Sequence, residues 1–277
     1  MEHFLADDGE TIHLKISGEG PPLVLLHGWT ASHQEWFPFL GELNEHHRVY
    51  RWDARGHGGH ALQADSRPNV HRMARDLLNL LEDFDLNDAV VAGHSMGALT
   101  LWQYIRDYGT RRLRKICLID QSPRLVTDDD WRHGIYGDFD AQRSRSFVAE
   151  LEQDFAESVL RLGALGLNQR ARQKYEENAR GWEKSRTWLQ QLDPKPLIAI
   201  WQSLTEADYR DVLREIDIPA LLIYGGESNF YHTQTANFVR DNIAGAILHI
   251  YEGTDHSPHQ WQRERFTQDL LAFARDA

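Results

Sequence analysis

Residues 89–100 constrain the fold of this chain more than any other stretch. A short apolar run at 89–92 leads directly into Gly93-His94-Ser95-Met96-Gly97, and a helical pattern follows. The two glycines permit a turn that is too tight for side chains at positions 93 and 97. A strand, a sharp turn and a helix in this order match the G-x-S-x-G pattern, which holds a serine hydroxyl at the carboxyl end of a buried strand. We therefore expect Ser95 to be a nucleophile.

The same alternation of strand and helix recurs along the chain. Short apolar or alternating runs predict strands at 11–17, 22–27, 48–53, 89–93, 115–120, 218–224 and 246–251. Helical periodicity lies between them, at about 70–84, 96–107, 232–243 and 260–274. This order predicts an α/β fold in which helices cover both faces of a mainly parallel, doubly wound sheet.

Residues 121–216 interrupt this alternation. No strand pattern occurs there, whereas 144–165 and 169–192 have the periodicity of amphipathic helices. We interpret 121–216 as a helical cap inserted into a core formed by 1–120 and 217–277.

The cap contains four of the nine tryptophans, Trp131, Trp182, Trp188 and Trp201. Tryptophans in such a segment usually bury it against the sheet. One or two of them can instead face a pocket, and we name Trp131 and Trp188 as candidate substrate-binding residues.

The composition limits the partners of the protein. The net charge is −12, from 30 basic and 42 acidic residues, and no run of basic residues predicts nucleic-acid binding. No apolar run approaches the roughly 18 residues that span a bilayer, and the acidic N-terminus lacks the apolar stretch of a signal peptide. The single cysteine, Cys117, cannot form an internal disulfide. We expect a soluble cytoplasmic protein with a small-molecule substrate, whose oligomeric state the sequence leaves open.

A general base is expected near the C-terminus. His256 lies in a turn after the strand at 246–251 and just before the last helix, where a histidine that follows a nucleophile and an acid in chain order is found. His259 competes with it, but its place at the start of the helix indicates a rim or capping residue. His94 is interpreted as a packed spacer that points away from the serine.

An oxyanion hole is expected from two backbone amides. His27-Gly28-Trp29 ends an early strand, and the amide of Trp29 can join that of Met96 to bind a developing negative charge. His57 and His60 raise the question of a metal, but no third ligand stands near them in the sequence. We therefore expect neither a metal nor a cofactor.

Taken together, these motifs resemble the α/β-hydrolase fold. The His-Gly-Trp loop, the Asp-x-Arg-Gly-His-Gly turn at 53–58, the Gly-His-Ser-Met-Gly elbow and the Asp-His-Ser-Pro-His segment at 255–259 are similar to those of the aryl-esterase, lactonase and cofactor-free haloperoxidase group. The resemblance covers nearly the whole chain apart from the cap. In most members of that group an aspartate follows the strand equivalent to 221–225, but this chain has Ser228 at that position.

The acid that orients His256 therefore has two candidates. Asp120 directly follows a buried strand, at the sheet edge that carries Ser95, where an unpaired charge would be costly. Some α/β-hydrolase relatives, including cofactor-free quinolone dioxygenases, keep their acid after this strand. Glu227, one position before Ser228, is the alternative. We assign Asp120, expect Ser228 to be a bystander in the pocket wall, and do not assign Asp255, since neighbouring residues in a turn tend to point apart.

These assignments imply a serine hydrolase that cleaves a small carboxylic ester or lactone through an acyl-enzyme intermediate. The aromatic cap favours an apolar or aromatic substrate. The alternative is a cofactor-free 2,4-dioxygenase of 3-hydroxy-4-quinolones that uses a dyad of His256 and Asp120. A receptor that keeps the pocket without catalysis is the weakest of the three interpretations.

Overall fold

The computed structural model describes residues 2–63 and 66–275. The strands are β1 (Glu2–Leu5), β2 (Thr11–Ser17), β3 (Pro22–Leu26), β4 (Arg48–Trp52), β5 (Ala89–His94), β6 (Leu113–Ile119), β7 (Ala220–Gly225) and β8 (Ile247–Tyr251). The α-helices are α1 (Leu40–Leu43), α2 (Val70–Asp83), α3 (Met96–Tyr108), α4 (Ala141–Gln153), α5 (Phe155–Ala164), α6 (Gln169–Glu176), α7 (Arg180–Leu189), α8 (Pro194–Glu206), α9 (Thr233–Asn242), α10 (Pro258–Trp261) and α11 (Arg263–Arg275). The described residues also form the 3-10 helices η1 (His33–Phe39), η2 (Ile135–Gly137) and η3 (Val212–Glu215).

The strands form one eight-stranded sheet in the order β1-β2-β4-β3-β5-β6-β7-β8. The pairs β1–β2 and β2–β4 are antiparallel, and every pair from β4–β3 to β7–β8 is parallel. The predicted α/β fold with a mainly parallel sheet is therefore confirmed. Strand β1 was not predicted, because Phe4 is its only buried residue and the segment has no apolar run.

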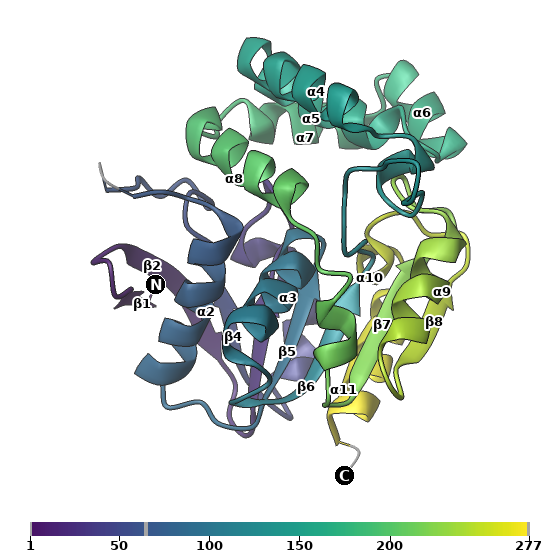
Figure 1. The fold of residues 1–277 in the computed structure, drawn as a ribbon. Coiled ribbons are helices and arrows are strands. Elements are labelled where there is room, and N and C mark those ends of the chain that lie inside the picture. The colour runs from purple at the N-terminus through teal and green to yellow at the C-terminus, as the bar shows by residue number, and fades with distance from the viewer. Residues whose placement is uncertain (1, 64–65, 276–277) are drawn as a thin grey trace.

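Successive residues of the central strands face two separate cores, which makes the sheet doubly wound. In β3, Val24 and Leu26 pack into the core that includes residues of α2 and α3. Leu23 and Leu25 pack into the opposite core, with residues of η1 and α11. Because both faces of the sheet are covered, β3 and residues 89–92 of β5 are apolar on both sides of the strand. Figure 1 shows α2 and α3 side by side over one face of the sheet.

Helices α4 to α8 lie beyond the carboxyl ends of the parallel strands, where Figure 1 shows α4 to α7 stacked above the sheet. The two long helices expected at 144–165 and 169–192 are each broken into two. Asp154 is both the C-cap of α4 and the N-cap of α5, where its side chain accepts from the amide of Glu157. A side chain that caps the next helix offers the backbone an alternative to continuing the first.

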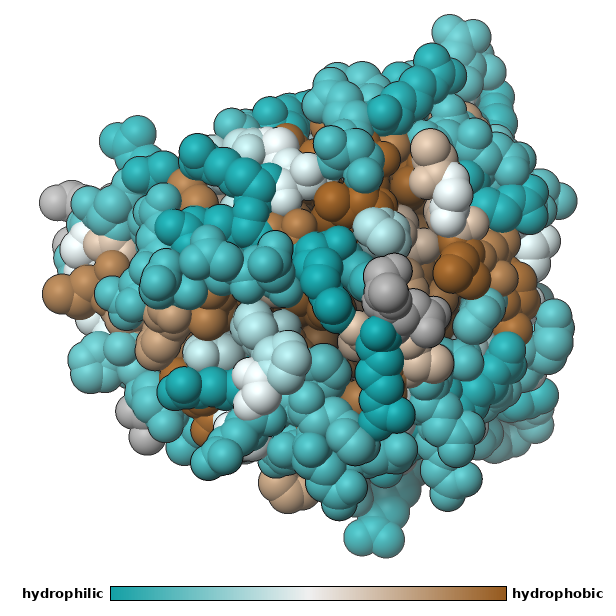
Figure 2. Space-filling model, turned by 90° about the horizontal axis from the view of Figure 1, so that it is seen from below, coloured by the Kyte–Doolittle hydropathy of each residue, from teal (hydrophilic) through white to brown (hydrophobic). Residues whose placement is uncertain are grey.

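Polar side chains cover most of the end of the molecule opposite these helices (Figure 2). Figure 2 shows this face as mostly hydrophilic, with hydrophobic residues in separate areas between polar ones. Among the described residues, no helix has both the length and the hydropathy needed to cross a membrane.

Candidate active site

Ser95 lies in the sharp turn between β5 and α3. Its φ is 52°, a left-handed conformation that is costly for a residue with a side chain. A Cβ atom at Gly93 would lie 2.5 Å from the backbone of Gly97, and one at Gly97 would lie 2.4 Å from the carbonyl oxygen of Leu26. The glycines are therefore required by the close approach of strand and helix.

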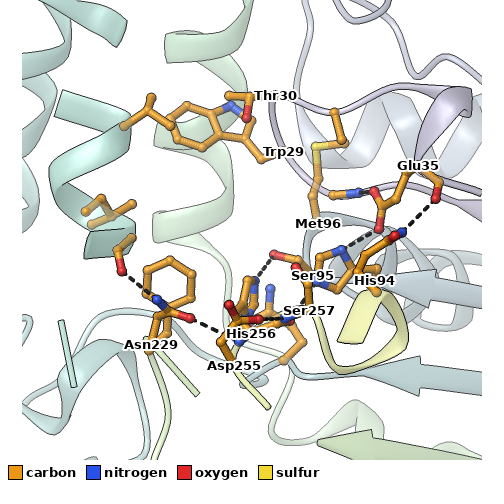
Figure 3. Close-up of a pocket in the computed structure, with 18 of the residues that line it drawn as sticks. Trp29, Thr30, Glu35, His94, Ser95, Met96, Asn229, Asp255, His256 and Ser257 are labelled. Atoms are coloured by element: carbon orange, nitrogen blue, oxygen red, sulfur yellow. Dashed lines mark hydrogen bonds and ion pairs between the residues drawn. The ribbon is translucent and has the colours of Figure 1, made fainter. Parts of the chain in front are cut away.

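His256 stands between Ser95 and Asp120 (Figure 3 shows the serine and the histidine). Its Nε2 lies 3.0 Å from Oγ of Ser95, and its Nδ1 lies 2.6 Å from Oδ2 of Asp120. Because a carboxylate only accepts, Nδ1 carries the proton and Nε2 is left to accept from the serine. Asp120 is fully buried and also has a left-handed φ, of 46°. The structure thus brings the three residues into the order that proton transfer from a serine requires.

The carboxylate of Asp120 is held by the last residue of β7 and by the turn that follows this strand. The amide of Gly225 donates to Oδ1 at 3.0 Å, and the hydroxyl of Ser228 donates to Oδ2 at 2.7 Å. Ser228 was expected to be a bystander in the pocket wall, and this expectation is wrong. Its side chain is buried and donates to the carboxylate that follows the neighbouring strand β6.

The other candidate acids lie elsewhere. Glu227 points away from the histidine, with a half-exposed carboxylate 3.7 Å from Arg170. Asp255 accepts a hydrogen bond from the amide of Ser257 at 2.8 Å and lies at the cavity wall.

The surroundings of His256 keep its ring neutral and in place. Burial lowers the pKa of His256, and the hydrogen bond to Asp120 acts in the opposite direction. Phe230 packs edge-on against the ring, with centroids 4.5 Å apart, and the backbone amide of His256 donates to Oδ1 of Asn229 at 3.0 Å. A neutral, oriented imidazole is the form that acts as a general base.

Trp29 and Met96 both line the cavity in front of Ser95 (Figure 3). Met96 is the first residue of α3, so its amide belongs to the helix N-terminus, where unpaired N–H groups favour negative charge. The indole of Trp29 donates to the carbonyl oxygen of Leu197 in α8, which ties this loop to the helices above it.

A buried cluster beside the serine was not predicted. Glu35, in η1, has Oε1 2.7 Å from Nδ1 of His94 and 2.9 Å from Nε2 of His259, as Figure 3 shows for the first pair. His94 was interpreted as a packed spacer, and it is indeed buried. His259, which was interpreted as a rim or capping residue, is fully buried instead. The contact of both rings with one carboxylate was not predicted. A histidine next to the nucleophile and a glutamate before a tryptophan were the only signals in the sequence.

Two groups of histidines bear on metal binding. The nearest ligand atoms of Glu35, His94 and His259 lie within 4.8 Å of one another. Nε2 of His259 already hydrogen-bonds to Oε1 of Glu35, and Nδ1 of His94 lies 2.7 Å from the same oxygen. His57 is buried, with a pKa that burial lowers to about 3, whereas His60 contacts Asp53 at 3.0 Å. The structure therefore gives His57 and His60 different environments.

The cavity above Ser95 has a volume of about 710 Å³. Its aromatic walls come mainly from tryptophans of the loop after β3 and of the helices above the sheet, namely Trp29, Trp182, Trp188 and Trp201. Trp188 thus lies where a substrate-binding residue was expected. Trp131 does not: it is buried outside the cavity, against Phe238 at a centroid distance of 4.9 Å.

The model of the alpha/beta hydrolase family matches residues 23–268. A pimeloyl-[acyl-carrier protein] methyl ester esterase from Vibrio vulnificus is 29% identical, covering 95% of this chain and 98% of its own. A non-heme chloroperoxidase from Kitasatospora aureofaciens is 28% identical, covering 96% of each chain. Among solved structures, an esterase from Exiguobacterium antarcticum superposes with a TM-score of 0.85 at 22% identity and 99% coverage of both chains. The chain belongs to the alpha/beta hydrolase family.

Proposed function

We propose that the protein is a serine hydrolase that cleaves a small carboxylic ester or lactone. The observation that carries this proposal is the 3.0 Å contact between Oγ of Ser95 and Nε2 of His256, whose other nitrogen is bound by Asp120. A neutral imidazole held in this way accepts the serine proton as the hydroxyl attacks. The relative from Vibrio vulnificus, which is named a methyl ester esterase, supports an ester as the substrate.

The reaction proceeds in two halves. His256 takes the proton of Ser95 while Oγ bonds to the carbonyl carbon, and the carbonyl electrons move onto oxygen, facing the amides of Trp29 and Met96. His256 then gives the proton to the leaving oxygen as its bond to the acyl carbon breaks. Water, deprotonated by His256, attacks the acyl-serine. The electron pair of the breaking ester bond then returns to Oγ, and His256 gives Oγ the proton that it took from water. Asp120 stabilises the imidazolium in both halves.

The cavity supports a neutral substrate with an apolar or aromatic group. Most of its upper wall is formed by tryptophans and aliphatic side chains, including Leu162 and Leu204. The described residues that line it include the carboxylates Glu35 and Asp255 but no lysine or arginine. His94, which also lines the cavity, is already paired with Glu35, so an anionic group would lose its hydration there without gaining an unpaired cationic partner. We therefore expect neutral aryl and alkyl esters to be preferred over monoesters of dicarboxylic acids, which keep a free carboxylate.

Hydrolysis of p-nitrophenyl acetate and butyrate tests the proposal. Ser95→Ala is expected to remove nearly all turnover, because without the nucleophile only binding and oxyanion effects remain. Ser144→Ala is the matched control, since Ser144 is a buried serine of α4 that does not line the cavity. Turnover that survives in Ser95→Ala, or that is lost when a chelator is added to the wild type, would contradict the proposal.

A second candidate function is favoured by the position of Asp120 after β6 rather than after β7. Cofactor-free quinolone dioxygenases resemble this chain in that placement, and a dyad of His256 and Asp120 would deprotonate a 3-hydroxy-4-quinolone for reaction with oxygen. Such turnover would consume oxygen, release carbon monoxide, persist in Ser95→Ala and be lost in His256→Ala. No oxygen uptake over a panel of these quinolones would exclude this candidate.

A further inference from the structure

The side chain of Glu35 contacts three segments at the active-site edge of the sheet. Its Oε2 accepts a hydrogen bond from the amide of Gly28 at 2.9 Å, next to Trp29. Its Oε1 lies 2.7 Å from Nδ1 of His94, the residue before the nucleophile, and 2.9 Å from Nε2 of His259, three residues after the base. One carboxylate therefore joins the oxyanion loop, the nucleophile turn and the segment that carries His256.

The contacts of His94 favour a cationic ring. Nδ1 faces the Glu35 carboxylate, and Nε2 lies 2.9 Å from the backbone oxygen of His256. The contact of Nε2 is a hydrogen bond, and that of Nδ1 is a short ion-pair contact rather than an aligned hydrogen bond. Because both partners are acceptors, a ring with two protons suits both contacts. Burial lowers the pKa of His94, but the charge of Glu35 outweighs this effect and raises it. Burial likewise raises the pKa of Glu35, while His94 and His259 bring it well below its ordinary value. The short contact and both pKa shifts favour an ion pair of Glu35 and His94.

His259 completes the cluster as a neutral donor. Burial lowers its pKa to about 4, so at neutral pH one ring nitrogen carries the proton. That nitrogen is Nε2, which faces the carboxylate, and the ring stacks on Trp36 with centroids 5.2 Å apart. Glu35 thus receives donors on both oxygens, which is what a buried carboxylate needs to remain ionised.

We propose that Glu35 is a positioning residue that acts through His94 to fix the oxyanion loop relative to His256. The chain of contacts runs from the amide of Gly28, through the carboxylate and the imidazolium, to the backbone oxygen of His256. These residues are closely packed, since a Cβ atom at Gly28 would lie 3.0 Å from Nδ1 of His94. The inference rests on the proposed function, because it assigns the loop of Trp29 to oxyanion binding.

Removing the charge of Glu35 breaks this series of contacts between Glu35 and His94. With a neutral partner, His94 loses the carboxylate that holds its second proton, and it can then donate to only one side. Either Gly28 or His256 is released from its position. A misplacement of about 1 Å in an active site costs on the order of 10²-fold in rate.

The test compares Glu35→Gln with wild type in hydrolysis of p-nitrophenyl butyrate, with kcat normalised to active sites titrated by a fluorophosphonate. We expect kcat to fall about 10- to 100-fold while KM changes less than about threefold. The affinity for phenylboronic acid, which forms a charged tetrahedral adduct with a serine, should fall with kcat/KM. Asp269→Asn is the control, because Asp269 contacts His249 at 2.9 Å and does not line the cavity.

The outcomes of this test separate the positioning role of Glu35 from the proposed function. An unchanged normalised kcat in Glu35→Gln beside an active wild type would overturn the positioning role and leave the proposed function standing. A wild type that hydrolyses no ester would contradict both.

If Glu35→Gln does not fold, His94→Gln replaces it with the same expected loss, and nitrogen NMR of the wild-type ring provides a measurement without turnover. Both ring nitrogens of His94 should be protonated at neutral pH, and a neutral ring would overturn the inference.

Discussion

The hydroxyl of Ser228 lies 2.7 Å from Oδ2 of Asp120, the same oxygen that lies 2.6 Å from Nδ1 of His256. Asp120 follows β6 and Ser228 follows β7, and these strands are parallel neighbours in the sheet. The carboxyl ends of both strands therefore lie beside His256. Ser228 stands after β7, where the resemblance leads one to expect an aspartate. In this chain it donates a hydrogen bond to Asp120, which stands after β6.

Asp120→Asn should leave the fold intact and lower kcat by about 10³- to 10⁴-fold, because an amide favours the wrong imidazole tautomer and cannot stabilise the imidazolium. Glu227→Gln is the matched control, since its carboxylate is half exposed beside Arg170. Steady-state kinetics of both variants on one ester decide the matter. A large loss in Glu227→Gln with an active Asp120→Asn would move the acid to the turn after β7.

Ser228→Ala removes one of the donors to the Asp120 carboxylate and leaves the Gly225 amide and His256 in place. A hydrogen bond to a charged group contributes about 1.5–3 kcal/mol, so we expect a lower unfolding free energy and roughly a tenfold fall in kcat. Denaturant titration and kinetics measure the two effects.

A double variant tests whether a carboxylate after β7 can replace the one after β6. In the Asp120→Asn background, Ser228→Asp should restore part of the lost rate, because position 228 lies within one hydrogen bond of the group that binds His256. No recovery in a folded double variant would show that a carboxylate at 228 does not reach the ring.

The pH dependence follows from the state of His256. The ring must be neutral to accept a proton, so kcat/KM falls as the pH drops through its pKa. Burial holds that pKa below the ordinary 6.5, although Asp120 opposes the shift. We expect one acidic limb with its midpoint below pH 6.5, moving lower still in Asp120→Asn. A midpoint above 6.5 in the wild type would contradict the burial of the ring.

Trp188→Ala should raise KM for aryl esters by about 2- to 10-fold with little change in kcat, the size expected when one aromatic contact is lost. Trp131→Ala is the control, because Trp131 is buried against Phe238 outside the cavity and should change only stability. Equal changes of KM in the two variants would remove Trp188 from the substrate site.

The features that the sequence predicts are those that depend on short-range patterns. Apolar runs and helical periodicity locate the central strands and the helices beside them, and the glycines of 93–97 fix the turn around Ser95. Asp120 could be placed because a strand end determines the edge of the sheet at which a side chain emerges.

The features that the sequence misses depend on long-range packing. Glu35 and His259 are 224 positions apart, and no periodicity connects them. The same holds for the direction of Ser228 and of Trp131, since a residue type at a strand end or in a cap does not determine which cavity or carboxylate it faces. The break at Asp154 was missed because its capping competes with a helical pattern that continues on both sides.

The central claim is that Ser95 is an activated nucleophile, and the most direct measurement is labelling with a fluorophosphonate followed by peptide mapping. The account predicts one phosphonyl group per chain, attached to Oγ of Ser95, with ester hydrolysis lost in proportion to labelling and no labelling in Ser95→Ala. Labelling at another residue, or full hydrolysis by the labelled protein, would contradict it.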